Sequence, residues 1–131
     1  MGLDNGINVC SKERILTRKD LPSIIKYPWA EDNDLEIVYW RKYWGLRTEI
    51  CRSFPYEDYY HITFNTPEEV KDLIKIICSW IDPERWEYEG QSVFSFDDAL
   101  PNLAQSVINL TAICEFMETN PDIYLEFYDS Y

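Results

Sequence analysis

The sequence predicts a single α+β domain over residues 1–131, in which a mostly antiparallel sheet carries about three helices on one side. Three observations lead to this class. The 131 residues are enough for one core that folds without metal or disulfide bonds. Hydrophobic residues make up 46% of the chain and aromatic residues 16%, which is typical of a folded protein. Segments with strand and helix periodicity follow one another without a repeat or a linker.

Strands are predicted where apolar and polar residues alternate. The clearest strand covers residues 35–40, where alternation places one set of side chains on each face: Leu35, Ile37 and Tyr39 on one, and Glu36, Val38 and Trp40 on the other. Aromatic and β-branched residues mark the remaining strands. They cover residues 7–10, 59–64 and 123–128, with a weaker strand at 92–96.

Helices are predicted where apolar residues recur three and four positions apart. A first helix occupies the segment after Tyr43. The clearest helix covers residues 67–81, because Thr66 is a good N-cap, Pro67 suits the first helical position and Glu69 completes a capping box.

The last helix is predicted to begin at a cap provided by Asp97 or Asp98 and to end at Asn120. Pro101 is tolerated inside its first turn. Its core stripe consists of Leu103, Val107, Leu110, Cys114 and Met117. The polar and acidic residues 84–91, which precede this helix, are predicted to form a loop.

Residues 36–44 place four aromatic rings around two adjacent cations, at the junction of a predicted strand and helix. One interpretation is a ligand-binding site in which Tyr39, Trp40, Arg41 and Lys42 offer stacking faces and a forked donor. The other is that the rings belong to the core while the two cations extend past them to solvent. The position at a strand-to-helix junction favours the core interpretation.

No catalytic or metal site is predicted, and no cofactor is expected. His61 is the single histidine, the four cysteines are scattered, and four glycines form no phosphate-binding loop. The longest nearly apolar run, at residues 73–81, is far shorter than the roughly 20 residues that cross a bilayer. We therefore expect a cytoplasmic protein that does not bind a membrane.

Short boxes spread along the chain give it a family resemblance. They are Met1-Gly2-Leu3-Asp4, Tyr39-Trp40-Arg41-Lys42, Tyr59-Tyr60 before an amphipathic helix, and Phe127-Tyr128-Asp129-Ser130-Tyr131. In these boxes the sequence resembles a family of small bacteriophage and prophage proteins that has no established activity. The resemblance implies a phage or mobile-element origin, and hence the cytoplasm of a host cell, but no particular reaction.

The sequence also departs from the family pattern. The segment before the last helix is reduced to Ser92-Val93-Phe94-Ser95-Phe96-Asp97, and the closing Trp of the family is Tyr131 here. If this segment forms a pocket in relatives, its reduction would remove that pocket from this chain.

Acidic charge is concentrated in the second part of the chain. Residues 1–52 have a net charge of +1 and residues 53–131 a net charge of −13, which gives the total of −12. Such a body repels nucleic acid and is attracted to the basic grooves of proteins that bind DNA or RNA. The simpler interpretation is that the acids keep an aromatic-rich protein soluble.

The candidate contact residues lie where acidic and aromatic side chains are neighbours, a composition typical of interfaces. They are Glu57, Asp58, Glu84, Trp86, Glu87, Tyr88 and Glu89. We expect a non-enzymatic phage-encoded inhibitor that binds a basic, nucleic-acid-binding defence protein of the host, as an anti-CRISPR or other anti-defence factor and possible nucleic-acid mimic. The alternative is a small-molecule or nucleotide-binding protein, or an enzyme, with its site near residues 39–44.

Overall fold

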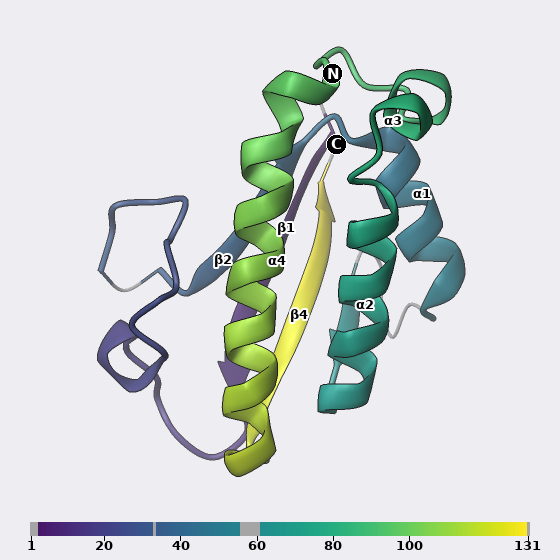
Figure 1. The fold of residues 1–131 in the computed structure, drawn as a ribbon. Helices are drawn as coiled ribbons and strands as arrows, with labels where there is room; N and C mark the ends of the chain where they lie inside the picture. Colours follow the sequence, from purple (N-terminus) through teal and green to yellow (C-terminus); the bar gives the residue numbers. More distant parts are fainter. Residues whose placement is uncertain (1–2, 33, 56–60, 131) are drawn as a thin grey trace.

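The computed structural model describes residues 3–32, 34–55 and 61–130 and shows a four-stranded antiparallel sheet with α2 and α4 across one face (Figure 1). The strands are β1 (Asp4–Ser11), β2 (Glu36–Arg41), β3 (His61–Phe64) and β4 (Ile123–Ser130). The α-helices are α1 (Trp44–Ser53), α2 (Pro67–Ser79), α3 (Pro83–Glu89) and α4 (Phe96–Thr119), and a 3-10 turn covers Arg18–Asp20. The predicted α+β class is confirmed, with four α-helices in the described residues instead of about three.

The two central strands come from opposite ends of the described chain. The strand order is β2-β1-β4-β3, and β1 pairs with β4 from Asp4 opposite Ser130 to Ser11 opposite Ile123. The side chains that these strands send toward the helices are apolar and buried, among them Ile7, Val9, Leu125 and Phe127. Because the centre of the sheet joins the first and last elements, the core closes only when β4 is in place.

Residues 84–91 are predicted to form a loop, but most of them belong to helix α3. Residues 92–96 are predicted to form a strand, but no strand forms there. Both predictions are wrong. Asp82 ends one helix and also starts the next, because its carboxylate accepts hydrogen bonds from two backbone N–H groups of α3 at 3.0 and 3.2 Å. Pro83 occupies the first helical position. Only Trp86 of the seven α3 residues is buried, so the sequence contains too few apolar positions to show a helical period.

Helix α4 begins before the residues that were predicted to cap it. Ser95 is the N-cap, and its hydroxyl accepts a hydrogen bond from the backbone N–H of Asp98 at 3.1 Å. Asp97 and Asp98 lie in the first turn instead, where their charges suit the positive end of the helix dipole. Pro101 consequently lies inside the helix rather than in its first turn.

A β-bulge changes which side chains of β2 share a face. Ile7 pairs with Val38, but the next residue of β1, Asn8, pairs with Glu36, so Ile37 is the extra residue. Glu36 therefore lies on the same face as Tyr39, which contradicts the predicted alternation. The period-two rule fails here because the bulge inserts one residue into the strand.

Two asparagines of α4 bind the backbone of β2, which is an edge strand. The side-chain amide of Asn102 donates a hydrogen bond to the carbonyl of Tyr39 at 2.9 Å, and that of Asn109 donates to the carbonyl of Ile37 at 2.9 Å. Asn109 also donates to the carbonyl of Lys26 at 2.8 Å and accepts from its N–H at 3.1 Å. These bonds hold the edge strand and the segment before it against the helix, and they satisfy carbonyl groups that an edge leaves open.

A buried ion pair connects α1 to the centre of the sheet. The guanidinium of Arg47 binds the carboxylate of Asp129 through two N–H groups, and its Nε lies 3.1 Å from Oδ2. The Asp129 side chain is completely buried, whereas that of Arg47 is 20% exposed. The side-chain amide of Asn5 donates a further hydrogen bond to Asp129 at 2.7 Å. The carboxylate thus has several donors where water does not reach it.

Candidate interaction surface

The structure divides the four residues predicted as a possible ligand site: Tyr39 and Arg41 line one hollow, whereas Trp40 and Lys42 do not. Trp40 is fully buried, and its indole N–H donates a hydrogen bond to the hydroxyl of Ser106 in α4 at 3.0 Å. Arg41 is exposed, while Lys42 adopts a φ of 60° at the turn from β2 into α1 and donates its backbone N–H to Leu3 at 2.7 Å. Trp40 therefore holds strand and helix together, and Lys42 is used for its backbone.

A hollow of about 210 Å³ does lie beside this box. Tyr39 and Arg41 of β2 line it, together with Phe94 from the segment before α4 and Asp98 from the first turn of α4. The volume is smaller than the roughly 300 Å³ at which sites for drug-sized ligands begin. The hollow is therefore large enough for a small fragment of a ligand only.

The sheet face opposite α4 contains a second set of buried polar contacts. Glu36 is only 8% exposed, and its carboxylate accepts hydrogen bonds from the Tyr128 hydroxyl at 3.1 and 3.3 Å. The Tyr128 side chain passes over Gly6 to reach Glu36, and a Cβ added at Gly6 would lie 2.4 Å from the tyrosine ring. Trp29 packs edge-on against Tyr39 with ring centroids 4.9 Å apart. Burial raises the pKa of Glu36 above its ordinary value, although hydrogen bonds from Trp29 and Tyr128 partly oppose the rise.

Replacing Glu36 with glutamine is expected to remove a loss of stability that the natural protein undergoes as the pH rises above 4.5, the ordinary pKa of the group, and through its raised pKa in the folded state. Because the pKa is raised on folding, the folded state holds the proton more tightly, and stability falls as pH rises through this range. The free energy of unfolding of Glu36→Gln, relative to that of the natural protein, should therefore increase with pH by at most about 1.4 kcal/mol per pH unit. Urea unfolding at several pH values measures the difference, and a pH-independent difference would contradict the prediction.

Trp86, predicted as a contact residue for a partner, is part of the core. It is 3% exposed, and its indole N–H donates a hydrogen bond to the carbonyl of Phe94 at 3.0 Å. Its ring packs edge-on against Tyr43 with centroids 4.9 Å apart and against Trp80 at 6.3 Å. The prediction is therefore corrected: Trp86 fixes α3 to the core because the helical turn directs it inward.

The other predicted contact residues of α3 are at the surface. Glu84, Glu87 and Glu89 are exposed, and the Tyr88 side chain is 82% exposed. Two apolar residues of the segment that follows α3 are exposed as well, Val93 at 75% and Phe94 at 38%. We call this set the α3 surface: Glu84, Glu87, Tyr88, Glu89, Val93 and Phe94. Residues 82–98 contain six acidic residues and one arginine, so this end has a local net charge of −5.

Two members of the α3 surface, Val93 and Phe94, are not among the contact residues that the sequence predicts, because the pattern at residues 92–96 predicts a strand. Their apolar side chains in a short polar segment are a signal for a contact surface. Glu57 and Asp58 lie outside the described residues.

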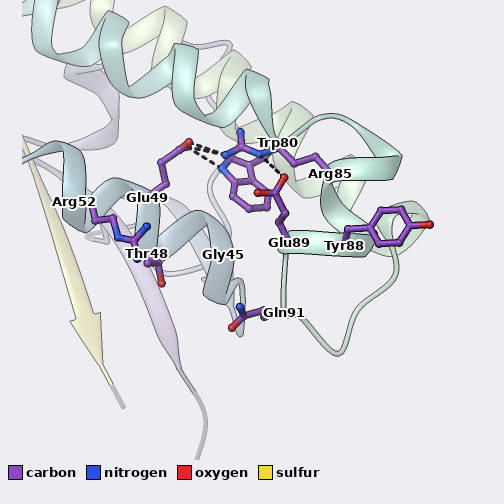
Figure 2. Close-up of a pocket in the computed structure, with 9 residues that line it drawn as sticks. All are labelled: Gly45, Thr48, Glu49, Arg52, Trp80, Arg85, Tyr88, Glu89 and Gln91. Atoms are coloured by element: carbon purple, nitrogen blue, oxygen red, sulfur yellow. Dashed lines mark hydrogen bonds and ion pairs between the residues drawn. The ribbon is translucent and has the colours of Figure 1, made fainter.

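A groove of about 390 Å³ runs between α1 and α3 (Figure 2). The guanidinium of Arg85 lies in it, 4.0 Å from the ring centroid of Trp80. The same guanidinium binds both carboxylate oxygens of Glu49 in α1 at 2.9 and 3.2 Å, and Glu49 also accepts a hydrogen bond from the Trp80 indole at 3.3 Å. Its contact with Glu89 is longer, at 3.6 Å, and the Glu89 side chain is 63% exposed. Arg85 therefore locks α3 against α1 and α2.

Gly45 allows α1 and α3 to approach this closely. Its backbone N–H donates a hydrogen bond to the carbonyl of Gly90 at 2.8 Å. A Cβ at this position would lie 2.4 Å from the backbone carbonyl oxygen of Glu89 and 2.6 Å from the Trp80 ring. A side chain here would push α3 away from α1.

One histidine and four free cysteines are the candidate bases and nucleophiles of the described residues. His61 lies 3.6 Å from a carboxylate oxygen of Glu126 on the exposed sheet face. Burial raises the pKa of the Cys10 and Cys114 thiols, the opposite of what a reactive thiolate requires. In the described ranges no group of three or more His, Cys, Asp or Glu side chains is placed to hold a metal ion. Nor does any helix of this part of the chain have the length and apolar character needed to cross a membrane.

The fold and surface define a small α+β protein with an acidic and aromatic surface at one end of its helical layer. Comparisons with protein-family models, with curated proteins and with solved structures found no match.

Proposed function

We propose that this protein is a non-enzymatic, phage-encoded inhibitor that acts in the host cytoplasm by binding a basic, nucleic-acid-binding defence protein, as an anti-CRISPR or other anti-defence factor. The observation that carries the proposal is the α3 surface, where Tyr88 is 82% exposed and lies on the same short helix as the exposed carboxylates of Glu84, Glu87 and Glu89. The resemblance of the sequence to small phage proteins supports the origin.

The composition of the α3 surface suits a basic partner. Tyrosine supplies contact area at a small entropic cost, and acids around it attract a positive surface and speed association. The carboxylates also repel nucleic acid, so the protein would compete with DNA or RNA for the partner's basic groove and would not bind the nucleic acid itself.

The α3 surface is held ready for such a contact before any partner binds. Trp86 fixes α3 from inside, and Arg85 ties it to Glu49 in α1 and to Trp80 after α2. A surface that is already ordered loses little conformational entropy on binding, which favours affinity.

Capture from a bacterial host lysate tests this function. The immobilised protein is expected to retain a basic protein at low salt and release it at about 0.5 M salt, because salt screens exposed charges. The variant Glu84→Gln/Glu87→Gln/Glu89→Gln should capture several-fold less. The control Glu31→Gln/Asp72→Asn/Glu115→Gln has the same net charge, removes exposed acids elsewhere, and should behave as the natural protein does. Absence of capture at low salt, or equal loss in both variants, contradicts the proposal.

The alternative is a small-molecule or nucleotide-binding role, for which the 210 Å³ hollow beside Tyr39 and Arg41 would accommodate one fragment of the ligand. Thermal unfolding with a panel of nucleotides separates the two functions. A ligand at 100 times its dissociation constant should stabilise the protein by about 2.7 kcal/mol, and Arg41→Ala should abolish the shift. The absence of any shift argues against this role.

A further inference from the structure

A second hollow, of about 350 Å³, lies on α3 and is lined by Asp82, Glu84, Arg85, Tyr88 and Glu89. We propose that it receives one arginine or lysine side chain of the partner, held between the Tyr88 ring and the carboxylates. This inference rests on the proposed function, because the side chain belongs to the basic protein of that proposal.

Arg85 is the one cationic residue that lines the hollow, and its closest contacts lie outside the hollow. Arg85 points into the neighbouring groove, where it stacks on Trp80 at 4.0 Å and binds Glu49 at 2.9 Å (Figure 2). Its side chain is only 25% exposed. The charge of Arg85 is therefore largely balanced by Glu49, which is not part of the hollow.

The negative charge of the carboxylates that line the hollow is larger than the single positive charge of Arg85. The side chain of Glu84 is exposed, and Glu89 contacts Arg85 only at 3.6 Å. Asp82 uses one carboxylate oxygen, Oδ1, to cap α3. Three carboxylates and one guanidinium thus line a space of about 350 Å³, which is enough for a single long cationic side chain.

Tyr88 forms an aromatic wall of this hollow. It is the most exposed aromatic residue of the described chain, at 82%, so its ring face is open to a partner. A cation placed over such a face is attracted by the ring quadrupole. The same kind of interaction occurs within the protein, where the Arg85 guanidinium stacks on the Trp80 ring and binds the Glu49 carboxylate.

Binding of short peptides to the full chain tests the inference. Acetylated tetra-arginine and tetra-lysine amides are titrated by calorimetry and by backbone NMR shifts, with tetra-citrulline as the neutral probe of the same shape as arginine. Both cationic peptides should bind and shift the signals of Tyr88 and its neighbours, whereas tetra-citrulline should not. Tyr88→Ala and Glu84→Gln should each weaken binding about two- to fivefold, and Tyr88→Phe should bind as the natural protein does.

The matched control is Glu115→Gln on α4, which changes the net charge by the same amount as Glu84→Gln. It should leave the peptide affinity unchanged. Equal weakening by Glu115→Gln and Glu84→Gln, or no effect of Tyr88→Ala, overturns the inference in favour of diffuse attraction. All of these variants alter exposed side chains, so their fold can be confirmed by circular dichroism.

The outcomes separate this inference from the proposed function. If a host protein is captured through the acids of the α3 surface but the peptides do not use the hollow, the inference fails and the function stands. If the peptides bind in the hollow but no host protein is captured, the function fails and the cation site stands.

Discussion

Replacing Arg47 with methionine is expected to lower the free energy of unfolding by about 3–5 kcal/mol. The carboxylate of Asp129 has no exposed area and would remain in the interior without its cation. Methionine keeps most of the apolar stem, so the loss reports the uncompensated charge more than lost packing. Urea unfolding followed by tryptophan fluorescence measures the change.

Two further variants isolate the charge as the cause. Arg52→Met alters an exposed residue of the same helix and should change the free energy of unfolding by no more than about 0.5 kcal/mol. Adding Asp129→Asn to Arg47→Met should recover at least about 1 kcal/mol, because the buried charge is then removed. A loss below about 1 kcal/mol for Arg47→Met alone would contradict the prediction.

Replacing Asn109 with leucine is expected to lower the free energy of unfolding by about 2–4 kcal/mol. Asn109 is 1% exposed, and leucine has a similar size but no polar atoms. The carbonyl of Ile37 and the N–H and carbonyl of Lys26 would lose their partner. The cost arises from these polar groups, which are wholly or partly shielded from water.

Hydrogen exchange locates this effect. The amide of Lys26 should exchange faster in Asn109→Leu, because its hydrogen bond to the asparagine oxygen is gone. Thr111→Leu, an exposed change on the same helix, should leave both the exchange and the stability within about 0.5 kcal/mol of the natural protein. Unchanged exchange at Lys26 in Asn109→Leu would show that these bonds hold nothing in place.

Features decided by near neighbours in the chain could be predicted. The start of α2 is the clearest case: Pro67 occupies the first helical position, and the Thr66 hydroxyl accepts a hydrogen bond from the N–H of Glu69 at 3.2 Å. The Glu69 carboxylate accepts a hydrogen bond from the N–H of Asn65 at 3.1 Å, one residue before the Thr66 N–H of the predicted capping box. The same local reasoning predicted the core stripe of α4, of which Leu103, Leu110, Cys114 and Met117 are buried. Such patterns are visible because caps and helical faces involve residues three or four positions apart.

Features decided by distant contacts could not be predicted. The burial of Trp86 depends on Tyr43 and Trp80, which surround its ring from other segments. The groove at Arg85 depends on Glu49 from α1, and the β-bulge at Ile37 depends on the register against β1. The candidate site was therefore only partly anticipated: its acids and Tyr88 were predicted, whereas the core position of Trp86 and the exposure of Val93 and Phe94 were not.

The α+β class, the main helices and strands, and the division of charge along the chain follow from the sequence alone, because periodicity, capping and charge are local properties. Which aromatic rings are exposed to solvent depends on the packing of distant segments. Trp40 and Trp86 are buried while Tyr88 is 82% exposed, although all three stand beside charged residues in the sequence. The physical reason is that burial depends on what surrounds a side chain in space, which neighbours in the chain do not specify.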